Sequence, residues 1–118
     1  MKQLLVLILT FSSLIAHSQS ISKVEVKNGN IYTLNSSGNE IGRFGMHSSD
    51  NFLGYSSEIV VVRKGNFIYS YNYKGIELGR FTSYGKFKGV QGKNILIEEN
   101  SYIYTRDFKG TELSRKSK

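Results

Sequence analysis

Residues that could form a catalytic set stand together at one place in the sequence. His47 is followed by two serines and Asp50, and serine, histidine and aspartate are the residue types of nucleophilic hydrolysis. The groups of such a set come from separated segments that the fold brings into hydrogen-bonding order, and neighbours in the sequence do not provide that geometry. We therefore interpret residues 45–50 as a polar loop.

Acid–base pairs, metal ligands and phosphate loops are also scarce. Glu98 and Glu99 are adjacent, but adjacent residues of a strand point to opposite faces and cannot act together. The chain has no cysteine and only two histidines, which disfavours a transition-metal site. No glycine-rich phosphate-binding motif is present. The sequence thus predicts a protein that is not an enzyme, with no catalytic residues, no metal site and no cofactor.

A stretch rich in aromatic residues is the better candidate for a functional site. Tyrosines alternate along it and an arginine follows, and both residue types are enriched at the hot spots of protein interfaces. The predicted partner-binding residues are Tyr69, Tyr71, Tyr73, Arg80, Tyr84 and Phe87. Two other interpretations stay open: the tyrosines cover the second face of a thin sheet, or they stack against sugar rings.

That stretch belongs to a segment that occurs three times, at residues 31–44, 68–81 and 103–116. Each copy begins with Ile-Tyr and contains one glutamate of a regularly spaced set. Successive glutamates are 37 and 35 residues apart: Glu40, Glu77 and Glu112. A period in this range is the mark of a repeat architecture.

Each copy reads as a set of short antiparallel strands. Residues 23–27 alternate apolar and charged side chains, which predicts a half-buried strand, and Asn28-Gly29 predicts a tight hairpin turn. The β-branched run at 59–62 predicts a strand buried on both faces. Residues 51–55 and 86–90 each predict a fourth strand with a glycine that permits a bulge. We expect these two strands to complete the copy before them, which leaves the last copy incomplete.

The side chains within a copy divide between two faces. We expect the isoleucines at the start of each copy, Ile31, Ile68 and Ile103, to lie in a common core. Each glutamate of the set precedes an arginine by three positions, and residues three apart in a regular strand lie on opposite faces. We therefore expect these charges to pair between copies and not within one copy.

The run from Gly29 to Ile41 resembles the blade repeat of quinoprotein-type β-propellers, in which an apolar strand, an Asp or Asn, a glycine turn and a charged-apolar strand recur in this order. The family's docking tryptophan corresponds to Gly42, Gly79 and Ser114, and this chain has no tryptophan. The resemblance implies a propeller-like fold, and it transfers no quinone or metal site.

The repeats define an all-β fold class. We predict three tandem antiparallel repeats of about 36 residues, each of three to four strands, in a compact threefold or propeller-like domain. A threefold domain of the β-trefoil kind is one version of this prediction. The alternative is a single curled antiparallel sheet.

The N-terminus has the layout of a secretory signal peptide. A short basic start precedes the apolar residues 4–15, and Ala16-His17-Ser18 places small residues before Gln19. The apolar run is too short to span a bilayer, which needs roughly 20 residues. We predict a signal peptide at 1–18 and one domain at 19–118, with repeats at about 21–55, 56–90 and 91–118. The protein is expected to be exported, to the periplasm or the medium.

Charge and size indicate the class of partner. Without the leader the chain has 15 basic and 9 acidic side chains, dispersed along the sequence, so we expect a protein partner with an acidic surface and no nucleic acid. The concrete form is a non-enzymatic inhibitor, or an immunity protein against a secreted toxin. The alternative is a glycan- or cell-surface-binding module, and peripheral membrane contact stays open. A third class is self-assembly through an unpaired last strand.

Overall fold

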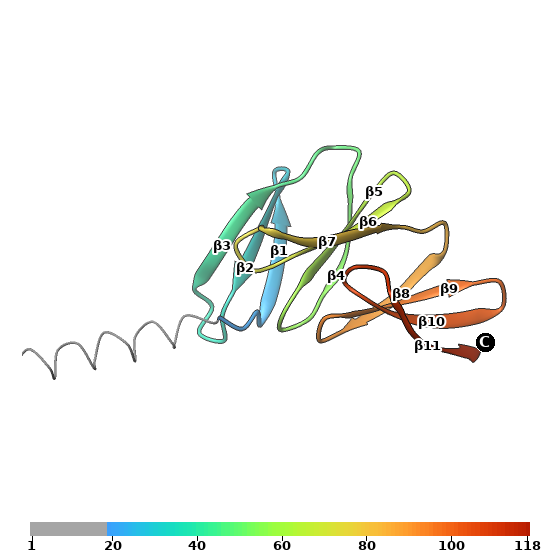
Figure 1. Ribbon diagram of the computed structural model, residues 1–118. Helices are drawn as coiled ribbons and strands as arrows, with labels where there is room; N and C mark the ends of the chain where they lie inside the picture. The colour runs from blue at the N-terminus through green and yellow to red at the C-terminus, as the bar shows by residue number, and fades with distance from the viewer. Residues whose placement is uncertain (1–18) are drawn as a thin grey trace, which may run out of the picture.

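A computed structural model describes residues 19–118, and within this range every regular element is a strand (Figure 1). In chain order the strands are β1 (Lys23–Lys27), β2 (Asn30–Leu34), β3 (Glu40–Gly45), β4 (Asn51–Tyr55), β5 (Val60–Lys64), β6 (Phe67–Tyr71), β7 (Glu77–Thr82), β8 (Lys86–Gln91), β9 (Asn94–Glu99), β10 (Tyr102–Asp107) and β11 (Glu112–Ser117). Across residues 19–118 no helix is long and apolar enough to cross a membrane. The predicted signal peptide lies outside the described residues.

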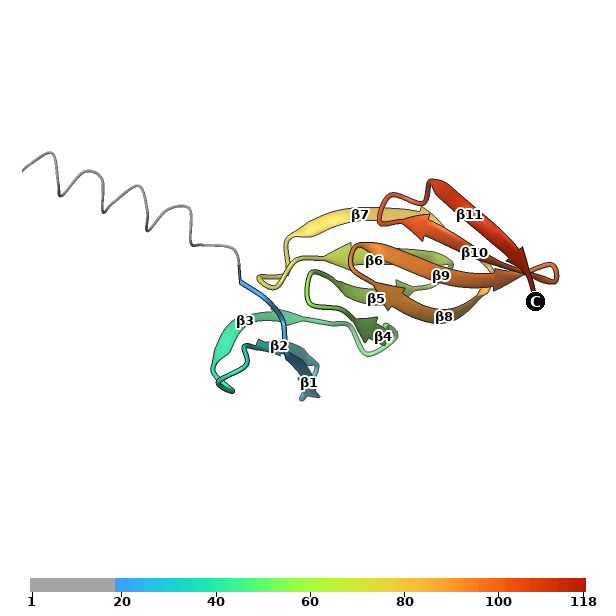
Figure 2. The same ribbon diagram turned by 90° about the horizontal axis from the view of Figure 1, so that it is seen from below.

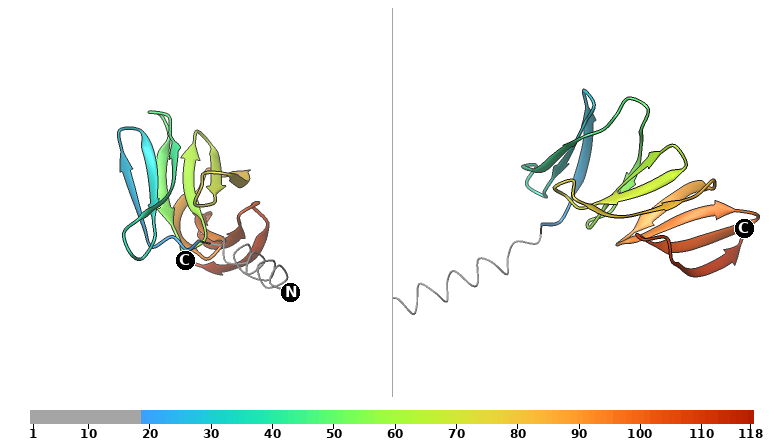
Figure 3. Two further views of the ribbon diagram at one scale, coloured as in Figure 1. Left: turned by 90° about the vertical axis from the view of Figure 1, so that its left-hand side faces the viewer. Right: turned by 45° about the horizontal axis from the view of Figure 1, so that its top comes forward.

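The strands form three separate antiparallel sheets. Sheet 1 has the order β1-β2-β3, sheet 2 the order β4-β5-β6-β7, and sheet 3 the order β11-β10-β9-β8. The sheets follow one another in chain order (Figures 2 and 3). The all-β prediction of three antiparallel repeats with three to four strands each is confirmed. The alternative of a single curled sheet is wrong, because no strand pairing joins one sheet to the next within the described residues.

The two connecting segments are strands, as predicted, but each begins the sheet that follows it. β4 pairs with β5, and β8 pairs with β9. The hydroxyl oxygen of Ser56 closes the turn between β4 and β5 by accepting bonds from the backbone N–H of Glu58 and Ile59, at 3.1 Å each. Gly92, with a φ of 58°, closes the next such turn. Because these short turns pair β4 with β5 and β8 with β9, sheet 1 has only three strands and sheets 2 and 3 have four each. The expectation of an incomplete last copy is wrong.

A β-bulge recurs in the last hairpin of every sheet. In sheet 1, Thr33 pairs with Gly42 but Leu34 pairs with Glu40, so Ile41 is an extra residue. The same shift occurs after Ser70 in sheet 2 and after Thr105 in sheet 3. An extra residue resets the alternation of a strand, and positions three apart then lie on one face.

The bulge overturns the expectation that the glutamates pair between copies. The Arg43 guanidinium donates to both carboxylate oxygens of Glu40, at 3.2 and 2.9 Å. The same two-bond pairs form within the other copies, between Arg80 and Glu77 and between Arg115 and Glu112. These pairs stand on the face that also holds the first tyrosine of each copy, because each arginine lies over that ring, as Arg43 does over Tyr32 at 4.8 Å.

The sheets pack face to face through two distinct sides. We call the side that contains Ile31, Ile68 or Ile103 the isoleucine face, and the side that contains Tyr32, Tyr69 or Tyr104 the tyrosine face. The isoleucine face of one sheet packs against the tyrosine face of the next. The first core contains Ile21, Ile31, Val60, Val62 and Tyr71, and the second contains Ile59, Val61, Ile68, Ile95 and Ile97.

The position of a sheet in this order decides how far its isoleucine is buried. Ile31 and Ile68 are 0% exposed, and burying such a side chain fully contributes about 1.5–3 kcal/mol. Ile103 is only partly buried, because no sheet of residues 19–118 packs on this face of sheet 3. The prediction of a common isoleucine core is therefore wrong: Ile31 and Ile68 are buried, but in two separate cores, and Ile103 belongs to neither.

Candidate functional site

Each joint between sheets is closed by a tight turn that docks on the isoleucine face of the preceding sheet. At the first joint the turn of residues 72–76, between β6 and β7, lies against sheet 1. The Thr33 hydroxyl donates a 2.8 Å hydrogen bond to the backbone carbonyl oxygen of Tyr73. A side chain at Gly42 would overlap this carbonyl, and one at Gly75 would overlap the Phe44 ring. The close approach therefore requires glycine at both positions.

The second joint repeats this arrangement. The turn of residues 107–111, between β10 and β11, lies against sheet 2. A Cβ at Gly79 would lie 2.6 Å from the carbonyl oxygen of Phe108, and one at Gly110 would lie 2.5 Å from the Cβ of Phe81. We call these segments docking turns. We call the group of residues that receives a docking turn a socket. A socket consists of a hydroxyl residue, a glycine and a phenylalanine.

The docking turns have one rigid geometry. The Asn72 side-chain oxygen accepts bonds from the backbone N–H of Lys74 and Ile76, at 2.9 and 3.0 Å. Asp107 accepts the two equivalent bonds in the last turn. Gly75 and Gly110 take positive φ values of 84° and 94°. An Asx residue with a left-handed glycine three positions later holds the turn in one conformation, so the carbonyl that docks is fixed in direction.

Sheet 3 presents a socket that no docking turn of residues 19–118 fills. Leu96, Ile103 and Thr105 are half-buried there, whereas their counterparts in sheet 2, Val61, Ile68 and Ser70, are 0% exposed. Ser114 replaces the socket glycine and Lys116 replaces the socket phenylalanine. We call this surface the open face.

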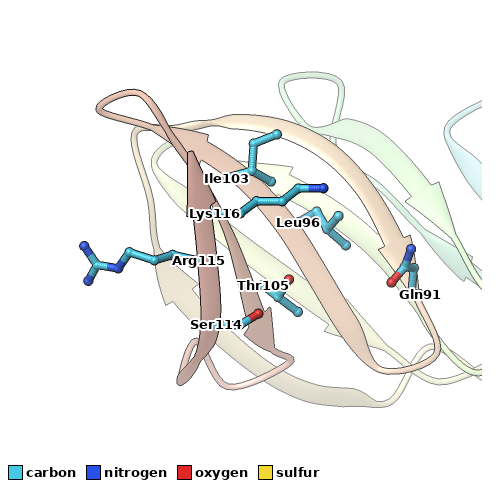
Figure 4. Close-up of a pocket in the computed structure, with 7 residues that line it drawn as sticks. All are labelled: Gln91, Leu96, Ile103, Thr105, Ser114, Arg115 and Lys116. Atoms are coloured by element: carbon cyan, nitrogen blue, oxygen red, sulfur yellow. The ribbon is translucent and has the colours of Figure 1, made fainter. Parts of the chain in front are cut away.

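A hollow of about 210 Å³ lies on the open face (Figure 4). Its lining residues are Gln91, Leu96, Ile103, Thr105, Ser114, Arg115 and Lys116. Figure 4 shows the Lys116 side chain extending between Ile103 and Leu96, while Arg115 points away to the other side of the strand. The hollow therefore combines two apolar side chains, Leu96 and Ile103, with polar groups, and one cation lies across it.

The open face carries an excess of positive charge. Glu98 accepts from Lys118, with 2.6 Å between Nζ and Oε2, and lies 3.5 Å from the Lys88 ammonium. The hydrogen bond from Lys118 holds the pKa of Glu98 below its ordinary value. Lys116 has no ion pair within residues 19–118. With Glu98 already shared by two lysines, the third cation is free to meet an anionic group.

The opposite end of the molecule, the tyrosine face of sheet 1, is polar and closed by its own contacts. Glu25 lies between Lys23 and Lys27, at 3.4 and 3.2 Å, where sheet 2 has Val60, Val62 and Lys64. Hydrogen bonding from Lys27, and then from Lys23, lowers the pKa of Glu25. This end therefore has the charged surface expected of a terminal repeat.

The structure brings together three of the predicted partner-binding residues, Tyr69, Tyr71 and Arg80, and both of these tyrosines pack at the first joint. The Tyr69 and Tyr71 rings stack with centroids 6.1 Å apart, and the Arg80 guanidinium lies 4.5 Å from the Tyr69 ring. Tyr71 is 9% exposed and its ring lies 5.2 Å from that of Phe44. These rings are occupied by neighbours within the chain, and their main contribution is to packing between sheets 1 and 2.

The other predicted residues lie apart from this stack. Tyr73 supplies the carbonyl of the first docking turn, and Phe87 packs against the second core. Tyr84, in the connection between β7 and β8, is 78% exposed. Of the six, Arg80 and Tyr84 retain the most free surface, although Arg80 is tied to Glu77 at 2.8 Å.

Sequence reasoning missed the residues of the open face. Their signal is a departure from the repeat: the third copy has Ser114 and Lys116 where both earlier copies have glycine and phenylalanine. The departure becomes meaningful only once those positions are known to form a socket. Comparing the three copies reveals the two substitutions, but their meaning depends on the packing between sheets.

The residues considered for catalysis have structural roles. The His47 backbone N–H donates to the Asp50 carboxylate at 3.1 Å, and the Asp50 N–H donates back to the His47 carbonyl oxygen at 3.0 Å, which closes a loop. Glu99 accepts from the Ser83 hydroxyl at 3.1 Å, whereas Glu98 belongs to the open face. Among residues 19–118 no three acidic, histidine or cysteine side chains are grouped so as to hold a metal ion.

Comparison with known proteins supports the fold alone. No family model and no curated protein matches the chain. A solved structure described as KlHsv2 with loop 6CD replaced by a Gly-Ser linker is similar, with a TM-score of 0.54 and 14% sequence identity. The match covers 81% of this chain and 34% of that chain, so the present chain spans about a third of its length. At this identity the likeness concerns the arrangement of strands and carries no activity across.

Proposed function

We propose that this chain is an exported, non-enzymatic protein-binding domain that engages an acidic partner, in the form of an inhibitor or an immunity protein against a secreted toxin. The observation that carries the proposal is the open face of sheet 3. Export rests on the predicted signal peptide.

The open face has the composition of an interface and not that of a closed end. Its half-buried Leu96 and Ile103 occupy the positions that are fully buried in sheet 2, at the second joint. Grouped apolar side chains with a charged rim mark an interaction surface. Lys88, Lys116 and Lys118 surround them against one acidic residue, Glu98. Charge complementarity then favours an acidic partner and makes association slower as salt rises.

The glycan alternative has less support from the tyrosines that motivated it. A sugar ring stacks on a free aromatic face, but Arg80 lies over Tyr69, and Tyr71 packs against Phe44. Tyr84 alone among the six predicted residues offers a largely exposed ring. We therefore place the binding surface on the open face.

Affinity capture from envelope and culture fractions at low and high salt tests the proposal. The wild-type chain is expected to retain an acidic protein at low salt and to release it at high salt. Lys116→Glu should abolish retention, while Lys74→Glu, the same charge change at an exposed lysine of the first docking turn, should not. The proposal fails if no protein is retained at low salt, or if both variants retain it equally.

A further inference from the structure

We infer that the open face binds a tight turn of its partner, with an acidic residue at or beside the left-handed position of that turn. The inference rests on the proposed function and specifies which element of the partner is recognised. Thr105 supplies a hydroxyl donor to a backbone carbonyl, and Lys116 pairs with the acidic side chain.

The surface that corresponds to the open face is filled in both of the other sheets. Both other isoleucine faces are filled by a turn of five residues, at 72–76 and 107–111, whose carbonyl oxygen approaches the socket glycine. Thr33 shows the hydrogen bond that such a face offers. Thr105 holds the corresponding position in the strand register, and its hydroxyl has no hydrogen bond within residues 19–118.

The open face differs from the two filled sockets at Ser114 and Lys116. The Cβ of Ser114 keeps a backbone carbonyl from approaching as closely as at Gly42 or Gly79, so the bound turn lies further out. Lys116 stands where Phe44 contacts Gly75 and Phe81 contacts Gly110. A flexible cation replaces a rigid ring there, so the glycine is no longer required. Aspartate tolerates the left-handed conformation of that position and offers Lys116 a carboxylate.

A second copy of this chain is a poor occupant. Its free turn, residues 35–39, has the docking geometry, with two 3.0 Å bonds to the Asn35 side chain and a Gly38 φ of 82°. That turn has no acidic side chain. Lys23 and Lys27 on the same end of the molecule would meet the lysines of the open face, and facing like charges oppose association. The occupant is therefore a turn of another, acidic protein.

Two cyclic peptides test the inference on the full mature chain. The first reproduces the hairpin of residues 104–113, which contains the second docking turn, and the second carries Lys109→Glu and Gly110→Asp. Backbone amide chemical shifts report binding. The acidic peptide is expected to shift the signals of Leu96, Ile103 and Thr105, and to bind about tenfold more tightly than the parent peptide at low salt, as an added charge pair of about 1.4 kcal/mol implies.

Two variants assign the contacts. Thr105→Val should weaken the acidic peptide about fivefold, as the loss of one hydrogen bond implies. Lys116→Glu should reverse the preference between the peptides. Circular dichroism checks that both variants fold, and Lys74→Glu serves as the matched charge control. Binding of neither peptide, equal binding of both, or an unchanged affinity in Thr105→Val would overturn the inference.

The result separates this inference from the proposed function. A partner that is captured through Lys116 while neither peptide binds leaves the protein-binding proposal intact and rejects the turn. A concentration-dependent dimer that Lys116→Glu abolishes would identify the second copy as the occupant and would also reject it.

Discussion

The hydroxyl of Thr33 donates to the carbonyl oxygen of Tyr73, 40 residues further along the chain, at 2.8 Å. At the second joint Ser70 holds the same position in the register, yet its oxygen is buried without a hydrogen-bond partner in residues 19–118. The two joints thus share one arrangement, but the second joint lacks the hydrogen bond from the socket hydroxyl to the docked carbonyl.

Replacing Ser70 with threonine is expected to stabilise the chain. The added methyl group restricts the side-chain rotamer and matches the geometry in which Thr33 reaches its carbonyl. We expect the free energy of unfolding to rise by about 1 kcal/mol, measured by urea denaturation. Thr33→Val should lower it by about the same amount, and Thr105→Val, on the open face, should leave it nearly unchanged. A destabilised Ser70→Thr would show that this site cannot take the methyl group.

The socket glycines are expected to be intolerant of any side chain. Gly42→Ala and Gly79→Ala each place a methyl group against a docked carbonyl, which should cost about 1–3 kcal/mol of unfolding free energy. Gly89→Ala is the control, because a Cβ there meets no atom within 4 Å, and its effect should stay within about 0.5 kcal/mol. Equal effects at all three positions in thermal denaturation would contradict the docking geometry.

Tyr71 and Tyr84 should separate packing from surface roles. Tyr71 is almost fully buried in the first joint, so Tyr71→Ala is expected to lose about 3–5 kcal/mol of stability, as for other buried aromatic residues. Tyr84→Ala removes an exposed ring and should leave the midpoint of urea unfolding unchanged. A stable Tyr71→Ala variant with impaired partner binding would instead support the prediction that Tyr71 contacts the partner.

The free energy of unfolding should fall at acidic pH. Hydrogen bonding from Lys27, Arg80 and Lys118 lowers the pKa of Glu25, Glu77 and Glu98 from the ordinary 4.5. A carboxyl whose pKa is lowered by folding stabilises the chain above its unfolded value and loses that contribution as the pH falls through the lowered, folded value. Urea unfolding at pH values above and below 4.5 should show this decline. Replacing all three by glutamine should flatten it, and high salt should weaken it because the pairs are exposed.

Local chemistry made most of the strands predictable, and long-range contacts decided what could not be predicted. Alternation at 23–27 and the Asn-Gly turn identify the first hairpin because both act between neighbouring residues. The bulge at Ile41 has no local signature, so the pairing of Glu40 with Arg43 was predicted wrongly. The placement of β4 depended on a turn built by one serine hydroxyl.

The candidate site was less predictable than the fold. Tyr71 is of a residue type common at interfaces, but its place between two sheets depends on Phe44, 27 positions earlier in the sequence. Lys116 attracts little notice in a basic C-terminal tail. It becomes informative only when sheet 2 shows what a phenylalanine does at the same position.

Sheet 2 differs from its neighbours in having both a complete socket and a complete docking turn. Sheet 1 has a complete socket, but its own turn at 35–39 contains serines. Sheet 3 has a docking turn, but Ser114 and Lys116 alter its socket. The molecule is thus directional: its two end surfaces differ, and of the two only that of sheet 1 is closed by its own contacts. A tandem duplication of residues 51–85 would add one sheet and preserve both end surfaces, whereas a duplication of either end would place a socket against a turn that does not match it. The middle sheet is therefore the unit whose duplication would lengthen the molecule without changing either end surface.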